Sequence, residues 1–261
     1  MKPQSLVAKL VPPQLFVRLV ALQYRFFEPE LRRLDAFVPL GKTAVDVGAW
    51  WGPWSWWLAR RASGVHAFEP NKSIYDALRT ALPDNVDLHN VALSDHRTEA
   101  TLWSPAGGRG TEGRSSLLPD GHETWLQQTV ETAVLDDFDL TNVGFVKIDV
   151  EGHELAVLRG ASKLIERERP NVFVEVDQAL HSGDDIEDVF SYFAERNYAG
   201  SFFAQRDWLP LSVFDRDEAR RDAERNKSTG MLLATLMPSK RHIHNFLFRP
   251  GNLNRPLPPL T

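Results

Sequence analysis

Two glycines and two acids in the first part of the chain have the spacing of a nucleoside-binding site. Asp46 ends an apolar run, and Gly48 and Gly52 lie in the turn before a helix-like segment. Glycine lets the backbone approach a ligand closely, and a helix N-terminus presents free N–H groups. Glu69 ends the next apolar run, where an acid can accept hydrogen bonds from both ribose hydroxyls. We therefore predict that these four residues contribute to a cofactor site.

The form of the turn favours S-adenosylmethionine over a nicotinamide dinucleotide. A dinucleotide fingerprint has a third glycine three residues after the second, and Ser55 stands there instead. An acid at the strand end also suits a cationic sulfonium and an amino acid better than a pyrophosphate. The sequence contains no Tyr-x-x-x-Lys pair. A nicotinamide-dependent oxidoreductase is therefore a less favoured alternative, and a strand–turn–helix unit without a ligand is another.

A second cluster of polar residues lies at the end of the apolar run 144–149 and just after it. We predict that its members Asp149, Glu151 and His153 are catalytic. Methyl transfer from a sulfonium depends mainly on positioning, but a hydroxyl acceptor benefits from a general base, which Asp149 or His153 can supply. In a second interpretation Asp149, Glu175 and Asp177 hold Mg²⁺, because hard oxygen ligands suit that ion. In a third, Glu151 and Glu154 only stabilise a helix N-terminus through the helix dipole, and Lys147 pairs with a strand acid.

Strand-like and helix-like segments alternate around these residues. Apolar, β-rich runs cover residues 43–47, 65–68, 86–93, 144–149 and 171–176, and helix-like stretches cover 54–61, 73–82, 154–168 and 186–196. This alternation predicts an α/β, Rossmann-like doubly wound fold with a mostly parallel sheet and helices on both faces. Ligands of such sheets bind beyond the carboxyl ends of the strands, which is where the candidate residues lie.

The chain is predicted to have three parts. They are an N-terminal helical extension at residues 1–40, a main domain at 41–248 and a Pro-rich tail at 249–261. Residues 99–134 interrupt the main domain with two strand-like runs around a Gly/Ser-rich loop, which predicts a β-hairpin insertion. Three more strand-like runs follow at 198–203, 231–236 and 245–248.

Composition limits the classes of function. The 261 residues are 43% hydrophobic, which is typical of a globular protein. A net charge of −5 does not indicate nucleic-acid binding. The absence of cysteine excludes thiolate chemistry and fits a cytoplasmic protein. No apolar run reaches the roughly 20 residues of a membrane span, although the apolar, mildly basic segment 5–22 can pack on the domain, join a homo-oligomer or contact a membrane surface.

Five motifs, in this order, resemble those of the FkbM-type methyltransferases, a class I S-adenosylmethionine-dependent family. They are Val-Asp-Val-Gly-Ala-Trp-Trp-Gly at 45–52, Phe-Glu-Pro at 68–70, Asn-Val-Ala-Leu-Ser-Asp at 90–95, Ser-Ser-Leu at 115–117 and Val-Lys-Ile-Asp-Val-Glu-Gly-His-Glu at 146–154. The last motif is the most specific. Trp50 stands where Asn is usual in the family.

The resemblance implies roles for individual residues. Asp46, Gly48 and Gly52 are expected at the methionine end of the cofactor, Glu69 at the ribose, and Asn90, Val91 and Ala92 near the adenine. It also implies O-methylation of a hydroxyl on a small-molecule or glycolipid acceptor, such as a sugar, glycolipid or glycosylated natural product. The alternative from a different class is a non-catalytic partner subunit that retains a nucleoside pocket.

Overall fold

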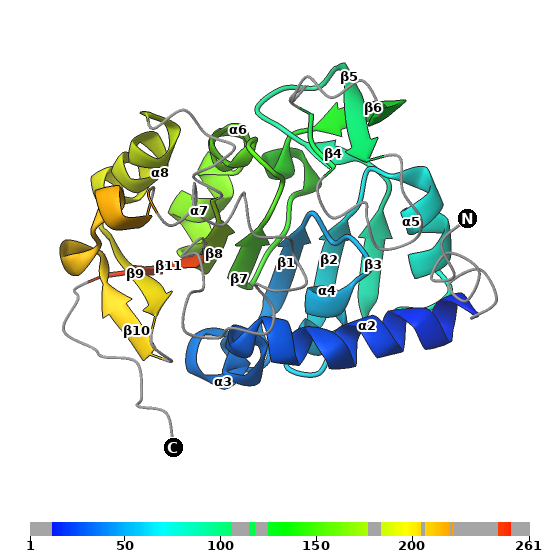
Figure 1. Cartoon of the computed structure of the whole chain (residues 1–261), viewed down its shortest axis with the longest axis horizontal. Coiled ribbons are helices and arrows are strands. Elements are labelled where there is room, and N and C mark those ends of the chain that lie inside the picture. Colours follow the sequence, from blue (N-terminus) through cyan, green and yellow to red (C-terminus); the bar gives the residue numbers. More distant parts are fainter. Residues whose placement is uncertain are drawn as a thin grey trace.

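The computed structural model describes residues 12–105, 115–117, 125–176, 184–204, 207–219, 221 and 245–251. An eight-stranded sheet forms its centre, in the order β10-β9-β11-β8-β7-β1-β2-β3 (Figure 1). The strands are β1 Thr43–Val47, β2 Gly64–Phe68, β3 Val86–His89, β7 Val143–Ile148, β8 Asn171–Glu175, β9 Tyr198–Ala204, β10 Asp207–Pro210 and β11 Asn245–Pro250.

Five adjacent strands of this sheet are parallel, and the other three are not. β8, β7, β1, β2 and β3 pair in parallel. β11 lies antiparallel between β8 and β9, and β10 pairs antiparallel with β9. The strand order reverses between β1 and β7, so the sheet is doubly wound with its switch point at that pair. The predicted Rossmann-like fold class is confirmed.

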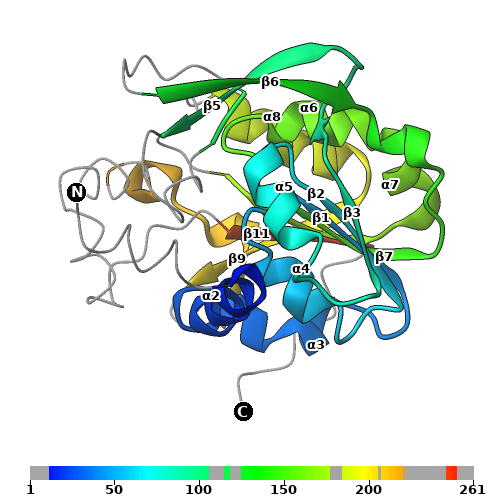
Figure 2. The ribbon, with the colours of Figure 1, turned by 90° about the vertical axis from the view of Figure 1, so that its right-hand side faces the viewer.

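Helices cover both faces of the sheet (Figure 2). Because side chains alternate along a strand, Val45 and Val47 of β1 pack with α6, α7 and α8, while Ala44 faces α3 and α4. A further cluster joins α2 and α5 to the same side as α4. The helices are α2 Pro13–Phe27, α3 Leu34–Phe37, α4 Pro53–Leu58, α5 Lys72–Leu78, α6 Glu154–Gly160, α7 Ser162–Glu168 and α8 Asp184–Glu195, with 3-10 turns η1 Pro29–Arg32, η3 Leu135–Phe138 and η4 Leu211–Val213.

The insertion forms a small second sheet above the carboxyl ends of the parallel strands (Figure 1). Its strands are β4 Ala92–Leu93, β5 Glu99–Pro105 and β6 Trp125–Ala133. β5 and β6 pair antiparallel, as expected of a hairpin, and β4 pairs in parallel with β6. The predicted strand at 86–93 therefore divides between two sheets. Residues 106–114 and 118–124 of the loop that connects the hairpin, and the strand-like run at 231–236, lie outside the described residues.

The predicted helix at 154–168 is also divided, into α6 and α7. A Cβ added at Gly160 would lie 2.1 Å from the carbonyl oxygen of Ser94, so the chain approaches a neighbouring backbone there. The carboxylate of Asp136 then accepts hydrogen bonds from the amides of Lys163 and Leu164 at 3.0 and 2.8 Å. This capping starts a new helix, and periodicity alone does not reveal it.

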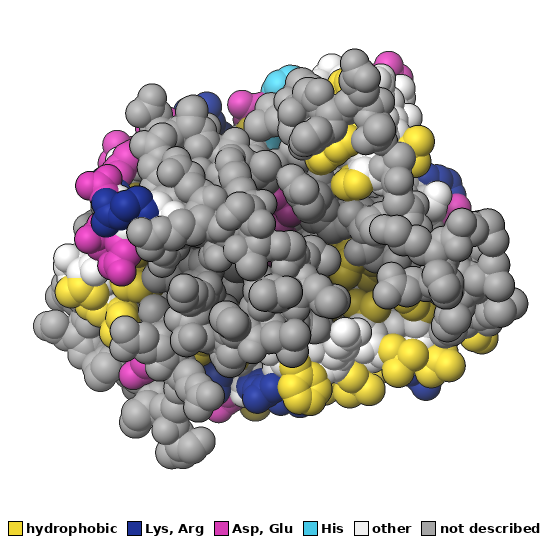
Figure 3. Space-filling view, viewed as in Figure 1, with side chains coloured by type: hydrophobic (Ala, Val, Ile, Leu, Met, Phe, Trp, Pro, Cys, Tyr) yellow, Lys and Arg dark blue, Asp and Glu magenta, His cyan; other side chains and the backbone are white. Residues whose placement is uncertain are grey.

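The N-terminal helix α2 packs against α4 and α5 through its buried face. Its outer face carries an exposed apolar stripe of Leu15, Leu19, Leu22 and Phe26, seen along the lower edge of the molecule (Figure 3). In the described ranges every helix is too short or too polar to cross a bilayer. Contact of the N-terminal segment with a membrane surface stays a prediction, as do the homo-oligomer and the cytoplasmic location.

Candidate cofactor cleft and active site

A cleft opens at the carboxyl ends of β1, β2 and β7, beneath the small sheet. It encloses about 630 Å³, including the space that opens to solvent. Seven of the predicted site residues line it, namely Gly48, Glu69, Val91, Ala92, Asp149, Glu151 and His153. Apolar side chains missed by the sequence reasoning complete its walls, among them Phe68, Ile74, Leu102 and Leu117. Phe68 and Leu117 lie in two of the quoted motifs, whereas Ile74 and Leu102 have only the signal of ordinary core residues.

Gly48 is required by the shape of the first turn. Its φ is +78°, and a Cβ there would lie 1.8 Å from the carbonyl oxygen of Asp149. The backbone of β1 thus passes directly against the end of β7. The amides of Gly48 and Ala49 donate to the carbonyl of Phe68 at 3.1 and 2.9 Å, which closes the turn over β2. A larger residue would separate the two strand ends that form the floor of the cleft.

Gly52 is a tightly packed helix cap, and its contact with the methionine end of the cofactor stays a prediction. It adopts φ +75° as the N-cap of α4, and a Cβ there would lie 2.9 Å from the side chain of Leu82 and 3.1 Å from that of Leu78. The residue is not among those that line the cleft. Its small size therefore serves the packing of α4 against α5 and the segment that follows it.

The carboxylate of Glu69 is fixed by two backbone amides. One oxygen accepts from the N–H of Trp50 and the other from the N–H of Asn71, both at 2.8 Å. Burial raises the pKa of Glu69 to about 8, although the two amides act in the opposite direction. The backbone at Trp50 is left-handed, with φ +48°, and Trp50 also lines the cleft. The carboxyl group is thus held rigidly at the end of β2.

Asn90 supports the turn next to Glu69 and is not among the residues that line the cleft. Its side-chain amide donates to the carbonyls of Glu69 and Pro70, at 2.9 and 3.0 Å. Val91 and Ala92, which follow it, reach the cleft. The three residues predicted near the adenine therefore divide into one that holds the backbone and two that form the wall.

Asp46 lies beneath the glycine turn. It is fully buried and accepts a hydrogen bond from the Ser55 hydroxyl at 2.5 Å. Burial raises its pKa, and the charge of Lys147, with Nζ 3.8 Å away, opposes that shift. Because Asp46 and Lys147 are register partners on β1 and β7, both side chains point to the same face of the sheet. Asp46 does not line the cleft.

Lys147 connects this buried acid to Asp149. Its Nζ lies 2.9 Å from a carboxylate oxygen of Asp149 and donates to the carbonyl of Gly48 at 3.3 Å. Burial alone would lower the pKa of Lys147, but Asp149 and then Asp46 outweigh it and hold the pKa above its usual value. The ammonium therefore stays charged and fixes Asp149, which remains partly exposed in the cleft.

The turn after Asp149 has an unusual backbone. Glu151 adopts φ +51° and Gly152 φ +102°. The Ser116 hydroxyl donates to the carbonyl of Glu151 at 2.6 Å, so the Ser-Ser-Leu motif holds this turn from the small sheet. Nε2 of His153 lies 2.9 Å from the Ser94 hydroxyl, and burial lowers the pKa of this imidazole.

Two groups at this end of the site come from the N-terminal segment, and the sequence reasoning missed both. The indole N–H of Trp54 donates to the carboxylate of Glu28. Burial raises the pKa of Glu28 to about 8, with Lys147 opposing the shift and Glu30 and Asp149 adding to it. The ring of Tyr24 lies 5.1 Å from that of Trp50. No motif marks these residues, because helix α2 is brought to the site only by packing.

The described members of the predicted Mg²⁺ set do not fit a magnesium ion. Asp149 is ion-paired with the buried ammonium of Lys147, which repels a second cation. Burial, and then the charge of Asp149, raise the pKa of Glu175 well above its usual value, which disfavours the ionised ligand form. Asp177 lies outside the described residues.

A glycine turn at the end of β1 and a fixed acid at the end of β2, on a doubly wound sheet, define a nucleoside-binding α/β domain of the class I methyltransferase type. The sequence matches the methyltransferase FkbM domain over residues 46–199, and the chain belongs to that family. The fold of this family implies S-adenosylmethionine as the methyl donor.

The chain is also similar to individual proteins. The hexuronic acid methyltransferase AglP of Haloferax volcanii is 29% identical over 137 residues, which are 51% of this chain and 54% of that protein. The chain thus aligns with about half the length of this relative. The FkbM methyltransferase of Methylobacillus flagellatus KT is 19% identical, with a TM-score of 0.46 over 65% of this chain and 42% of that one. A putative methyltransferase of Streptococcus mutans, crystallised with SAH, is 9% identical, with a TM-score of 0.45 over 85% and 97% of the two chains.

Proposed function

We propose that this chain is an O-methyltransferase that transfers the methyl group of S-adenosylmethionine to a hydroxyl of a sugar, glycolipid or glycosylated small molecule. The observation that carries the proposal is that Glu69 and Asp149 line one cleft beside the Gly48 turn, with Asp149 paired to the buried Lys147 beneath it. One end offers a fixed acceptor for ribose hydroxyls, and the other offers a carboxylate oriented by a buried cation. A hexuronic acid methyltransferase among the relatives supports a sugar as acceptor.

The cofactor would lie along the carboxyl ends of the strands. The ribose hydroxyls donate to Glu69, whose oxygens are already oriented by two amides. Val91 and Ala92 contact the adenine, and the close backbone at Gly48 leaves room for the methionine part. In this assignment Asp46 acts through Lys147 and Ser55, so it positions the floor of the site and does not touch the ligand.

Asp149 is the proposed general base. As the acceptor hydroxyl attacks the methyl carbon, the C–S bond breaks, its electron pair stays on sulfur, and the hydroxyl proton passes to the Asp149 carboxylate. Lys147 orients that carboxylate, and proximity supplies most of the acceleration. His153 is the alternative base, but its Nε2 is engaged by Ser94. Glu151 lines the same end and is assigned to the acceptor side.

Calorimetric titration tests the first step. The chain is expected to bind S-adenosylmethionine and not NAD. The variant Glu69→Gln should bind the cofactor about tenfold more weakly, because one acceptor oxygen for the ribose is replaced by an amide donor. Unchanged affinity in this variant would contradict the ribose role. Glu131→Gln, an exposed acid on β6, is the matched control.

A radiolabelled methyl group tests the second step, with uronic acids, neutral sugars and glycolipids as acceptors. Transfer to a hydroxyl oxygen supports the proposal, and transfer to nitrogen or carbon contradicts it. Cofactor binding together with no transfer to any acceptor would favour the non-catalytic partner subunit instead.

A further inference from the structure

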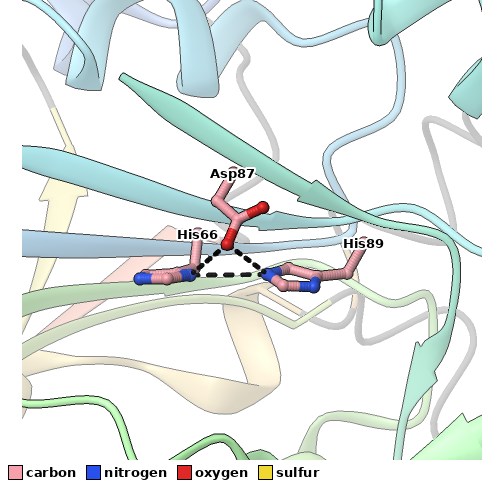
Figure 4. A group of neighbouring side chains, drawn as sticks. All are labelled: His66, Asp87 and His89. Atoms are coloured by element: carbon pink, nitrogen blue, oxygen red, sulfur yellow. Dashed lines mark hydrogen bonds and ion pairs between the residues drawn. The ribbon is translucent and has the colours of Figure 1, made fainter. Parts of the chain in front are cut away.

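Three potential metal ligands meet on the edge of the sheet, away from the acids of the active site. His66 lies on β2, and Asp87 and His89 lie on the edge strand β3. His66 is the register partner of Asp87, and His89 follows Asp87 by two residues, so all three side chains point to the same face. Figure 4 shows the two imidazoles facing each other, with one carboxylate oxygen above the gap between them.

The three ligand atoms form a nearly equilateral triangle. Nδ1 of His66 lies 3.4 Å from Nε2 of His89, and the Asp87 oxygen lies 3.5 and 3.6 Å from these two nitrogens. A tetrahedral zinc ion with bonds of about 2.1 Å has its ligand atoms about 3.4 Å apart. An ion therefore fits with shifts of only about 0.2 Å in any of these separations. In the described part of the chain, no other group of histidine and acid side chains meets this spacing.

The surroundings hold the ligands in place and leave one side open. The His89 ring stacks on Phe68 at 4.7 Å and meets the edge of Phe138 at 5.1 Å. The histidine side chains are 26% and 22% exposed and that of Asp87 is 67% exposed, so solvent can reach a fourth position. Burial lowers the pKa of both imidazoles, which favours the neutral, ligating form.

We propose that His66, Asp87 and His89 bind a divalent transition-metal ion, preferentially Zn²⁺, with water as the fourth ligand. Two imidazole nitrogens and one carboxylate oxygen suit zinc, whereas Mg²⁺ and Ca²⁺ prefer oxygen ligands alone. Both facing nitrogens then carry lone pairs, so the ring protons lie on Nε2 of His66 and Nδ1 of His89. The ion would join β3 to β2 at the open edge of the sheet, where backbone pairing is available on one side only.

The test uses the untagged full chain and zinc or cobalt alone. Zinc should bind as a single ion per chain and raise the unfolding midpoint, by an amount that grows with the logarithm of free zinc. Cobalt should give the strong visible absorption of a tetrahedral site. Magnesium at the same concentrations should do neither.

Variants assign the site. His66→Gln and His89→Gln should each weaken zinc binding by about tenfold or more, while His96→Gln, an exposed histidine beside Asp95, leaves it unchanged. Circular dichroism of each variant without metal establishes that it is folded. The absence of zinc binding by the unmodified chain would overturn the proposal. So would binding that survives both substitutions and disappears in the double variant His242→Gln/His244→Gln, since that pair lies outside the described residues.

Discussion

At the scale of single residues, the site depends on polar side chains that are each held in orientation by a hydrogen-bonding partner. Lys147 holds Asp149, two amides hold Glu69, and Ser94 holds His153. The acids at the strand ends were predictable because strand ends and turns can be read from periodicity. Lys147 lies two residues from Asp149, and its pairing with a strand acid was among the interpretations; the Ser94 partner of His153 comes from a distant part of the sequence and was not predictable. The Asp46–Lys147 contact depends on the register of β1 against β7.

Substitution of Asp149 by Asn should separate catalysis from binding. Loss of a general base costs roughly 10²- to 10⁴-fold in turnover, while the cofactor contacts at Glu69 and Gly48 remain. We therefore expect kcat to fall and the dissociation constant for S-adenosylmethionine to change little. Turnover is measured with radiolabelled donor once an acceptor is known, and binding by calorimetry. Turnover close to that of the unmodified chain would remove Asp149 from the role of base.

Substitution of Gly48 by Ala should destabilise the fold strongly. A left-handed backbone costs an Ala about 1 to 2 kcal/mol, and the new Cβ would also meet the Asp149 carbonyl at 1.8 Å, which adds about 1 to 3 kcal/mol. Gly41→Ala is the matched control, because Gly41 has φ +72° with nothing within 4 Å of the added Cβ.

Urea denaturation measures both glycine variants. Only the backbone cost should appear in Gly41→Ala, so its unfolding free energy should exceed that of Gly48→Ala. Equal losses would mean that the β1 and β7 ends separate easily, and that the close approach at Gly48 is not a fixed part of the site.

At the scale of elements, the sequence predicted the existence of strands and helices better than their ends. The core strands are short runs of buried apolar residues, which periodicity detects. The division of 86–93 into β3 and β4, and of 154–168 into α6 and α7, was missed. Both divisions occur where the chain passes from the main sheet to the insertion or packs against it. Gly160 against Ser94 is such a tertiary contact, and no local pattern encodes it.

Glu28, the C-cap residue of helix α2, is a buried titratable group, and its burial has a consequence for stability. The pKa of Glu28 is raised to about 8 by burial, against an unfolded value near 4.5. Between these values the folded chain binds more protons than the unfolded chain. The free energy of unfolding therefore decreases as pH rises through this window, by up to about 1.4 kcal/mol per pH unit for one proton.

Glu28→Gln should remove this contribution while keeping an acceptor for the Trp54 indole. We expect the variant to match the unmodified chain near pH 5 and to be the more stable of the two near pH 8. Urea denaturation at a series of pH values measures the difference. A difference that does not change with pH would show that Glu28 ionises at its ordinary value. The exposed acid variant Glu131→Gln should show no such trend.

At the scale of the whole molecule, the N-terminal extension and the methyltransferase domain share one core. Val17 and Val20 of α2 belong to the same cluster as Ala49 and Trp51 of the glycine turn. The ring of Phe16 also lies 4.8 Å from that of Trp51. The boundary predicted at residue 40 thus separates parts of the sequence that lie together in space, and the stability of the cofactor turn should depend on α2.

Two substitutions on α2 test this dependence. Val17 is fully buried, and Val17→Ala should cost about 2 kcal/mol of unfolding free energy. The substitution should also weaken S-adenosylmethionine binding, because the cavity left by the lost methyl groups of Val17 lies beneath the turn that carries Trp50 and Trp51. Leu19 is 49% exposed on the other face of the same helix, so Leu19→Ala should change stability by less than about 0.5 kcal/mol. Denaturation and calorimetry give both quantities, and weakened cofactor binding in Val17→Ala but not in Leu19→Ala would place α2 in the energetics of the site. If the two variants bind the cofactor equally well, α2 supports the fold without influencing the turn.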